Sequence, residues 1–520
     1  MRYMKTRKKQ NDWNGIYKIL TTIFLVLLFG VYPLFNTGNY RTLLQGKTGY
    51  LYIVTGSFFF AMLLVCVLES IRNKRIILLN NYSKGSVTDY AVMAFLFISV
   101  LSWVCNGHKE DLFWGGYGRN VGLLVILSCG GIYFLSSRFG ELSQGILFVM
   151  LGTMSAVSLV AIVNFLGIDL LGMYSNLQDR KEFLSTMGNV TVLSSYLAIM
   201  VATVMGLLFV AQEKMSCVVY GVITVLGLMG MFSCGTDSVY LVLGVVLVVL
   251  FFFAKQAEQG RKWLLLCGET VGALLLVCIL RRVRVDACLE MSSALTRLLL
   301  DDSRSIVVSI TVLFVVGTLA LVCKKEKTWK SIRKFLIIML LVCLAGLIGV
   351  MVVMNCFYDG QVAKDMLGGL GSYLYFGDDW GTKRGQIWGL SFLVFGRMSW
   401  LEKILGCGPS GYFFALQDYL TSSDLACVTV KGVLVDAHSV YLQLLIGQGL
   451  LGFVSYFMIF ASSISKCIFT CERNPKVVIY ILWMVSFLIQ GMVNNIHIFI
   501  EPICFALLGV WTRLLFVEDE

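Results

Sequence analysis

The stretch FLIIMLLVCLAGLIGVMVVM, residues 335–354, runs for twenty residues without a charged side chain. A helix of about this length crosses the hydrocarbon core of a bilayer and satisfies its own backbone hydrogen bonds. The whole chain has the same character, since 58% of its 520 residues are hydrophobic and only 14% are charged. Soluble domains carry about 25% charged residues. This composition excludes a soluble globular protein and favours spanning helices over the short alternating strands of a barrel.

Apolar segments of similar length recur along almost the whole chain. They occupy residues 14–36, 49–70, 88–106, 119–136, 143–167, 189–211, 215–233, 238–254, 263–280, 305–323, 335–355, 439–465, 477–493 and 499–516. Segments of this length and character predict transmembrane helices. We therefore expect an all-α, polytopic integral membrane protein with about 12–14 transmembrane helices, in a single domain that covers residues 1–520.

The distribution of Lys and Arg predicts how the helices are oriented. With a cytoplasmic N-terminus, the inner loops hold most of the 42 basic residues, including RNKR (72–75) and KKEKTWKSIRK (324–334). This agrees with the positive-inside rule, although RRVRV (281–285) then lies on the outer side. The net charge of +11 is therefore read as topology and contact with anionic lipid, not as nucleic-acid binding. We expect cytoplasmic N- and C-termini and a large extracytoplasmic loop, residues 356–437, between the eleventh and twelfth spans.

The long loop contains a short amphipathic segment and a glycine-rich turn. RGQIWGLSFLVF begins at Arg384, is too short to span a bilayer, and has the apolar spacing of a helix that lies at the membrane interface. Trp388 follows Arg384 by about one helical turn and favours that depth. GCGPSG (406–411) then predicts a tight turn. A loop of this size is where binding and catalytic residues are expected.

A second polar group opens the twelfth apolar segment, VDAHSVYLQLLIGQGLLGF (435–453). It contains Asp436 and His438, in a chain with only three histidines, all on the predicted outer side. The usual pKa of histidine, about 6.5, suits a general base at neutral pH. Asp436 would orient this base, or would serve only as an N-terminal helix cap. His497 and Glu501, four residues apart at the last segment, predict an interfacial pair.

No metal or cofactor site is indicated by the sequence. There is no His-Glu-x-x-His or Asp-x-Asp motif, and no cysteine pair has zinc-ligand spacing beside a histidine. Most of the sixteen cysteines lie inside apolar segments, where they act as small hydrophobic residues. Cys407 and Cys427 share the long loop, and they either form a disulfide or remain free thiols.

The order of these motifs resembles the O-antigen ligase and Wzy-type polysaccharide polymerase superfamily. The resemblance is carried by Arg-x-x-x-Trp in an outer loop, then a Gly-x-Gly turn, then AHSVYLQLLIGQGLLG (437–452). WGGYGRNVGLL (114–124) and RKEFLSTMGNVTVLSSYL (180–197) resemble two further elements of the family. The resemblance to this superfamily implies a GT-C-like, multi-pass membrane glycosyltransferase in a bacterial cytoplasmic membrane.

The chain departs from the family pattern at three positions. Ser439 stands where Asn is usual, Gly447 where an acidic residue is frequent, and Thr191 where a second Asn is usual. These departures leave the subfamily and the substrate open.

The resemblance implies a polyprenyl-pyrophosphate-linked glycan as donor and a sugar hydroxyl as acceptor nucleophile. Without a metal, arginine would neutralise the departing pyrophosphate, because its planar guanidinium grips phosphate oxygens in pairs. The expected catalytic residues are His438 as base, Asp436 as its orienting group and Arg384 at the leaving group; the expected substrate-binding residues are Arg119, Arg180, Trp388 and Tyr441. Each also has a structural reading, as a helix cap, a headgroup contact or a membrane-interface aromatic.

Two related reactions and one unrelated function remain open. The first is polymerisation of lipid-linked oligosaccharide repeat units for a surface polysaccharide, with the bilayer and other polysaccharide-assembly membrane proteins as partners. The second is ligase-like transfer of a finished glycan to a lipid, protein or wall acceptor. The third is a transporter or lipid-linked glycan flippase, which the absence of a visible internal repeat disfavours.

Overall fold

The computed structural model describes residues 2–74, 85–116, 119–176, 178–284, 294–368, 371–426, 434–495 and 497–517. Each apolar segment of the sequence is helical. The long helices are α1 (Arg2–Val26), continued by the π-helical turn η1 (Leu27–Val31) and by α2 (Tyr32–Leu34), α3 (Tyr40–Asn73), α4 (Val87–Cys105), α6 (Leu123–Phe139), α7 (Gln144–Phe165), α9 (Val190–Val210), α10 (Lys214–Ser233), α11 (Ser238–Phe253), α12 (Ala257–Val283), α14 (Arg304–Val322), α15 (Glu326–Phe357), α22 (Val440–Gly447) with α23 (Gly449–Thr470), α24 (Val477–Val493) and α25 (Glu501–Val517).

Ten helices in the described part of the chain are long and apolar enough to cross a membrane. Three shorter apolar helices, α6, α11 and α24, accompany them. The expected all-α, polytopic membrane fold is confirmed.

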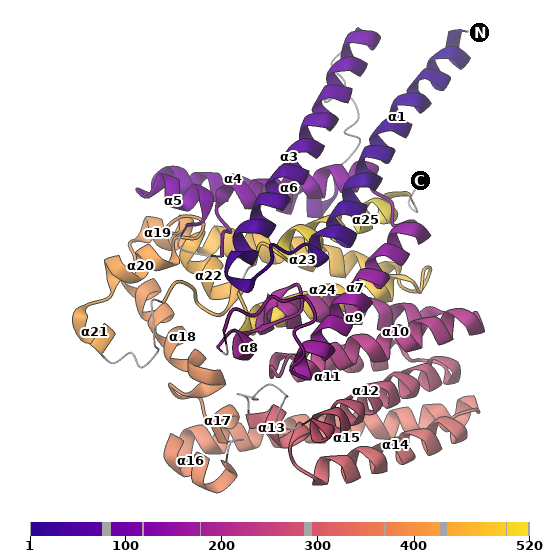
Figure 1. Cartoon of the computed structure of the whole chain (residues 1–520), viewed down its shortest axis with the longest axis vertical. Helices are drawn as coiled ribbons and strands as arrows, with labels where there is room; N and C mark the ends of the chain where they lie inside the picture. The colour runs from indigo at the N-terminus through magenta and orange to yellow at the C-terminus, as the bar shows by residue number, and fades with distance from the viewer. Residues whose placement is uncertain are drawn as a thin grey trace.

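Further helices, all but α18 short, join these. They are α5 (Lys109–Trp114), α8 (Asp179–Glu182), α13 (Ala294–Leu300), α16 (Gly360–Leu367), α17 (Gly371–Leu374), α18 (Trp380–Arg397), α19 (Trp400–Leu405), α20 (Tyr412–Tyr419) and α21 (Ser422–Ala426), and a two-residue antiparallel hairpin, β1 (Phe183–Leu184) with β2 (Gly188–Asn189), follows α8. Figure 1 shows α5 and α16 to α21 along one side of the molecule, whereas both chain ends lie toward the other side. The segment between α15 and α22 is thus mostly helical where it is described, and it gathers opposite the termini.

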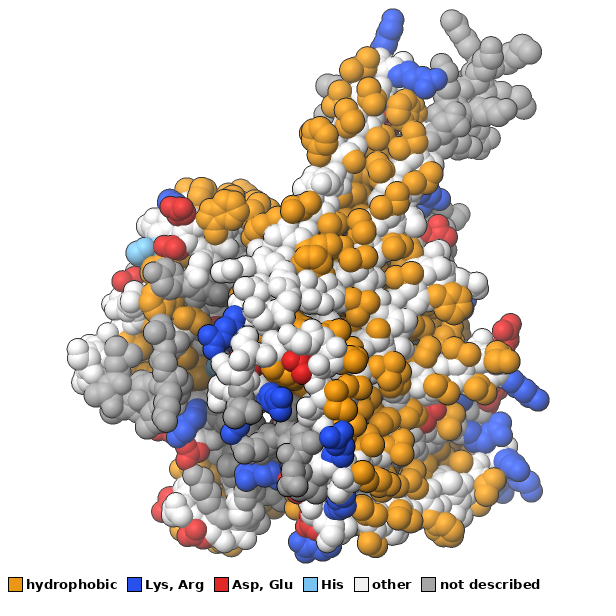
Figure 2. Space-filling view, viewed as in Figure 1, with side chains coloured by type: hydrophobic (Ala, Val, Ile, Leu, Met, Phe, Trp, Pro, Cys, Tyr) orange, Lys and Arg blue, Asp and Glu red, His pale blue; other side chains and the backbone are white. Residues whose placement is uncertain are grey.

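The centre of the bundle is α9, whose side chains are almost all buried. Glycines bring its neighbours close: a Cβ atom at Gly206 of α9 would lie 2.9 Å from Ile479 Cα of α24. Small residues at such contacts let membrane helices approach. At the edge, the apolar window of α15 has no buried side chain. Figure 2 shows hydrophobic side chains covering α3 where it projects and the face below it, as expected for surfaces in contact with lipid.

The twelfth expected span is broken, which corrects the prediction of one continuous helix over residues 439–465. Helix α22 ends at Gly447 and α23 begins at Gly449, which has a positive φ of 65°. The glycine-rich turn docks at this break, since Cys407 N donates to Ile446 O at 2.9 Å and Gly408 N donates to Gly447 O at 2.8 Å. Backbone N–H groups of the long loop thereby satisfy carbonyl oxygens at the C-terminal end of α22. Hydrophobicity alone could not reveal this break, because the contact comes from a distant segment.

Substitution of Gly406 by alanine should destabilise the fold. Gly406 has a φ of 82°, and a Cβ atom there would lie 2.2 Å from Gly447 O. Backbone strain and overlap together should cost about 3 kcal/mol, which a lower midpoint of thermal unfolding in detergent would reveal. Gly389→Ala is the matched control, because Gly389 lies within α18 with nothing within 4 Å of its added methyl group. Equal midpoints for the two variants would contradict this account of the docked turn.

Candidate active site

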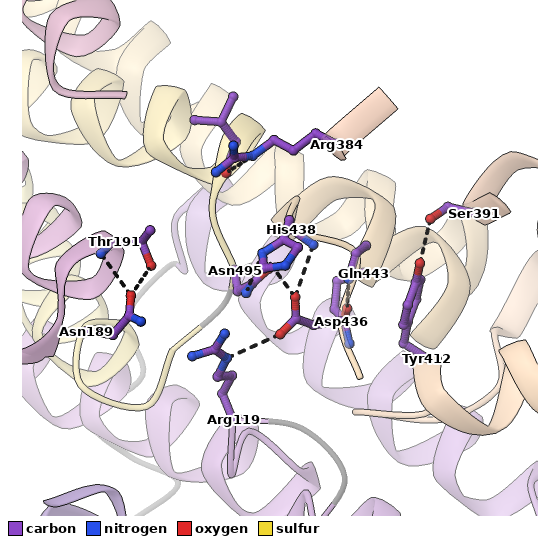
Figure 3. Close-up of polar contacts among 12 residues, drawn as sticks. Arg119, Asn189, Thr191, Arg384, Ser391, Tyr412, Asp436, His438, Gln443 and Asn495 are labelled. Carbon is purple, nitrogen blue, oxygen red and sulfur yellow. Dashed lines mark hydrogen bonds and ion pairs between the residues drawn. The ribbon is translucent and has the colours of Figure 1, made fainter. Parts of the chain in front are cut away.

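Four segments far apart in the sequence bring polar side chains together (Figure 3). Arg119 comes from the turn between α5 and α6, and Arg384 from the first turns of α18. Asp436 and His438 lie in the segment that leads into α22, and Asn495 follows the end of α24. Of the residues expected from the sequence, the structure thus joins Arg119, Asp436 and His438 directly.

Asp436 is the centre of this group. Its side chain is only 6% exposed, and Oδ2 accepts a hydrogen bond from Arg119 Nε at 3.2 Å. Oδ1 accepts from the backbone N–H of His438 at 3.2 Å and lies 3.4 Å from His438 Nδ1. The N-cap of α22 is Ser439, so Asp436 does not serve as the cap of that helix. Its carboxylate instead joins an arginine to an imidazole.

His438 is held at the mouth of the site in an uncommon conformation. Its φ is 48°, a left-handed value that few residues other than glycine adopt. The side chain is 40% exposed, and Asp436 Oδ1 and Asn495 Nδ2 both lie near Nδ1, the latter at 3.3 Å. Nδ1 can serve only one of them at a time: as N–H it donates to Asp436, and as a lone pair it accepts from Asn495. In the tautomer with Nδ1–H directed to Asp436, Nε2 carries the lone pair that can accept a proton.

Electrostatics keep this imidazole neutral. Burial lowers the pKa of His438 below its usual value, and the positive charges of Arg384 and Arg119 act in the same direction. The negative charge of Asp436 opposes them and raises the pKa. A histidine with a lowered pKa is deprotonated at neutral pH, which is the state that a general base requires.

Arg384 lies close enough to influence this histidine, and its own side chain is fixed. Nε donates to Val493 O, at the end of α24, at 2.8 Å, and Nη1 donates to Gly381 O at 2.6 Å. Within the described part of the chain, Nη2 has no hydrogen-bond partner. Burial lowers the pKa of Arg384, while nearby Asp237 and Asp436 favour its charged form. Arginine stays protonated in proteins, so this site holds a half-buried positive charge.

The remaining helices of the loop support this arrangement. Tyr373 of α17 donates to Asp237 at the start of α11, and Trp380 Nε1 donates to Tyr373 O at 3.1 Å. On the other side of α18, Ser391 Oγ and Tyr412 Oη lie 2.8 Å apart within a small apolar core shared with α20 and α22. These contacts place α18 against the bundle from both sides.

Three expected substrate-binding residues lie outside the polar group. Arg180 is exposed on α8, with its guanidinium 5.8 Å from the ring centroid of Tyr174. Trp388 packs on Trp380 with ring centroids 5.0 Å apart, and its buried indole N–H has no hydrogen-bond partner among the described residues. Tyr441 donates its hydroxyl to Leu488 O at 2.6 Å, so this hydroxyl is already engaged. Their roles in binding stay predictions.

Sequence reasoning missed Asn495 and Gln443. Gln443 Oε1 accepts from Ala437 N at 3.1 Å and so fixes the segment between Asp436 and His438. Asn495 belongs to a polar pair, Asn494 and Asn495, that separates the last two apolar segments. That polar interruption on the predicted outer side was the available signal.

Two expectations about metal and disulfide chemistry concern the same region. Among the described residues, no group of three or more His, Cys, Asp or Glu is placed to hold a metal ion. Cys427 lies outside the described residues, and so does the pairing proposed for it with Cys407.

Comparison with known proteins gives one family match. Residues 291–457 match the family model Wzy_C, O-antigen ligase. The matched segment covers about a third of the chain and includes Arg384, Asp436 and His438, whereas Arg119 and Asn495 lie outside it. A search of curated proteins found no match. The resemblance to the O-antigen ligase and Wzy-type superfamily is thereby confirmed through this segment.

Proposed function

Since residues 291–457 carry an O-antigen ligase domain, we propose that the protein is a bacterial membrane glycosyltransferase that polymerises polyprenyl-pyrophosphate-linked repeat units on the outer face of the cytoplasmic membrane. The observation that carries this proposal is the imidazole of His438, which Asp436 contacts and which lies near two arginines. Of these residues, only Arg119 lies outside the matched segment. A base next to cationic groups suits transfer of a sugar from a phosphate leaving group.

The proposed reaction is a displacement at the anomeric carbon of the donor sugar. Nε2 of His438 takes the proton of an acceptor hydroxyl as its oxygen bonds to that carbon, and the bond to the pyrophosphate oxygen breaks. Asp436 stabilises the imidazolium that forms. Arg384 and Arg119 neutralise the charge that gathers on the departing pyrophosphate. The imidazolium, which is partly exposed at the mouth, then releases its proton to water.

Transfer of a finished glycan to a second acceptor is the alternative, and the description of the matched family as an O-antigen ligase favours it. The same residues would serve, because only the molecule that presents the acceptor hydroxyl differs. Purified protein in nanodiscs, given a lipid-linked repeat unit alone, distinguishes the two. A ladder of longer glycans supports the polymerase, whereas product that forms only after a second acceptor is added supports the ligase. No transfer under either condition would contradict both.

The pH dependence of transfer tests His438 as the base. Its pKa is lowered by burial, so the rate should be level near pH 7 and should fall only as the pH drops below about 6.5. Asp436→Asn removes the charge that raises this pKa, so the acid limb should move to still lower pH while the maximal rate decreases. Asp424→Asn, at an exposed ion pair with Arg397, should leave the limb in place. An acid limb that moves to higher pH in Asp436→Asn would contradict the assignment.

A further inference from the structure

A pocket that opens at the polar group leads into the helix bundle. Arg119, Ser410, Asp436 and Asn495 line its polar part. Tyr456 also lines it, seven residues after the start of α23, or about 10 Å along that helix. The pocket therefore extends from the candidate active site into the part of the bundle built by spanning helices.

The inner walls of the pocket are apolar and aromatic. They include Phe95 of α4, Cys129 of α6 and Phe505 of α25. Phe95 and Tyr456 meet edge to face, with ring centroids 5.2 Å apart. Such walls suit the apolar faces of a sugar ring, and their described residues include no Lys or Arg to pair with an anion.

The carboxyl group of Glu501 interrupts these walls, as do the amide side chains of Gln443 and Gln448. Glu501, the first residue of α25, is 5% exposed. The hydroxyl of Tyr456 lies 3.4 Å from Oε1 and 3.5 Å from Oε2, which is long for hydrogen bonds between oxygens. No Lys, Arg or His among the described residues forms an ion pair with Glu501. A carboxyl group has more acceptor sites than the hydroxyl of Tyr456 can fill, so Glu501 offers unfilled acceptor capacity inside the pocket.

His497 does not supply the missing partner, which corrects the expected interfacial pair. Both His497 and Glu501 are buried, and His497 Nδ1 accepts from Phe499 N at 3.2 Å. Buried acceptors are normally satisfied, so an unfilled one that faces a cavity points to a ligand.

We propose that this pocket is the subsite for the donor sugar that carries the pyrophosphate, and that Glu501 accepts a hydrogen bond from a hydroxyl or amide N–H of that sugar. The inference rests on the proposed function. The arginines at the mouth attract the pyrophosphate, whereas the described residues of the inner walls include no Lys or Arg, so the sugar end of the donor enters first. A sugar that lacks the hydroxyl or amide group leaves the buried acceptor of Glu501 without this hydrogen bond.

The first test measures donor kinetics with lipid-linked oligosaccharide extracted from source cells that lack this protein. Glu501→Ala should raise the KM for this donor by about 3- to 10-fold and change kcat by less than about threefold, because it removes one hydrogen bond to a buried carboxyl group. Glu69→Gln is the matched control, since Glu69 is equally buried and accepts from Tyr17 at 2.9 Å far from the pocket. An unchanged KM in Glu501→Ala would overturn the subsite.

A second readout does not require transfer. Binding of the extracted donor can be followed as a rise in the midpoint of thermal unfolding of the protein in detergent. The donor should raise this midpoint in the wild-type protein and in His438→Gln, but less in Glu501→Ala. An equal rise in all three would overturn the role of Glu501, and no rise in any would overturn the pocket. A rise without any product would leave the subsite standing and reject the proposed transfer.

Discussion

His438→Gln is expected to reduce glycan transfer by about a thousandfold or more while the protein remains folded in the membrane. A general base contributes about 10²- to 10⁴-fold, and glutamine cannot accept the proton that the acceptor hydroxyl loses. The side chain is 40% exposed and packs in no core, so the fold should tolerate the change. The measurement is the rate of product formation on a gel, with lipid-linked repeat unit in nanodiscs.

The control for this variant is His108→Gln. His108 is also exposed, and its ring stacks on Phe414 with centroids 3.8 Å apart, away from the polar group. It should keep wild-type activity. A His438→Gln protein that transfers glycan at the wild-type rate would reject His438 as the base.

Arg384→Ala is expected to lower kcat by about 10²- to 10³-fold. Loss of one preorganised group that stabilises developing charge costs about this much, and the departing pyrophosphate is the most highly charged species in the proposed reaction. Arg384→Lys should recover only part of the rate, because an ammonium group cannot grip two phosphate oxygens in the planar geometry of a guanidinium. Both variants would be measured with the same donor at saturation.

Arg397→Ala provides the matched control on the same helix. Arg397 lies at the other end of α18 and pairs with Asp424 at the surface. Its loss should leave kcat within about twofold, since exposed ion pairs contribute little to stability. If Arg384→Ala and Arg397→Ala had the same kcat, Arg384 would be a structural contact between α18 and α24 and not a leaving-group residue.

The spanning helices were predictable because their cause is local. Any run of about 20 apolar residues must form a helix to satisfy its backbone in lipid, so residues 335–354 reveal α15 without knowledge of neighbours. Hydrophobicity alone misses the break between α22 and α23, although Gly447, Gln448 and Gly449 interrupt the apolar run. The contact made there was not predictable, since the turn at residues 406–411 docks its backbone at the break from a distant part of the sequence.

The candidate site divides in the same way. Asp436 and His438 are close in sequence, so their contact could be expected from composition and spacing. The partners that complete the group come from elsewhere, since Arg119 is 317 residues away from Asp436 and Asn495 is 57 residues away from His438. Tyr441 was expected to bind substrate because it lies one helical turn after His438. Its hydroxyl instead donates to the carbonyl of Leu488 in α24, a contact that the local sequence does not reveal.

The hydrogen bond between Arg384 and Val493 O links two tasks that the proposed reaction keeps chemically separate. Val493 ends α24 and stands two residues before Asn495, whose amide touches His438. A pyrophosphate that binds Arg384 competes for the guanidinium that holds this carbonyl, so it acts on the segment that contacts the imidazole. Thermodynamic linkage makes the effect reciprocal: whatever donor binding does to the protonation of His438, protonation of His438 does to donor affinity. Substrate arrival and readiness of the base would then be one coupled equilibrium.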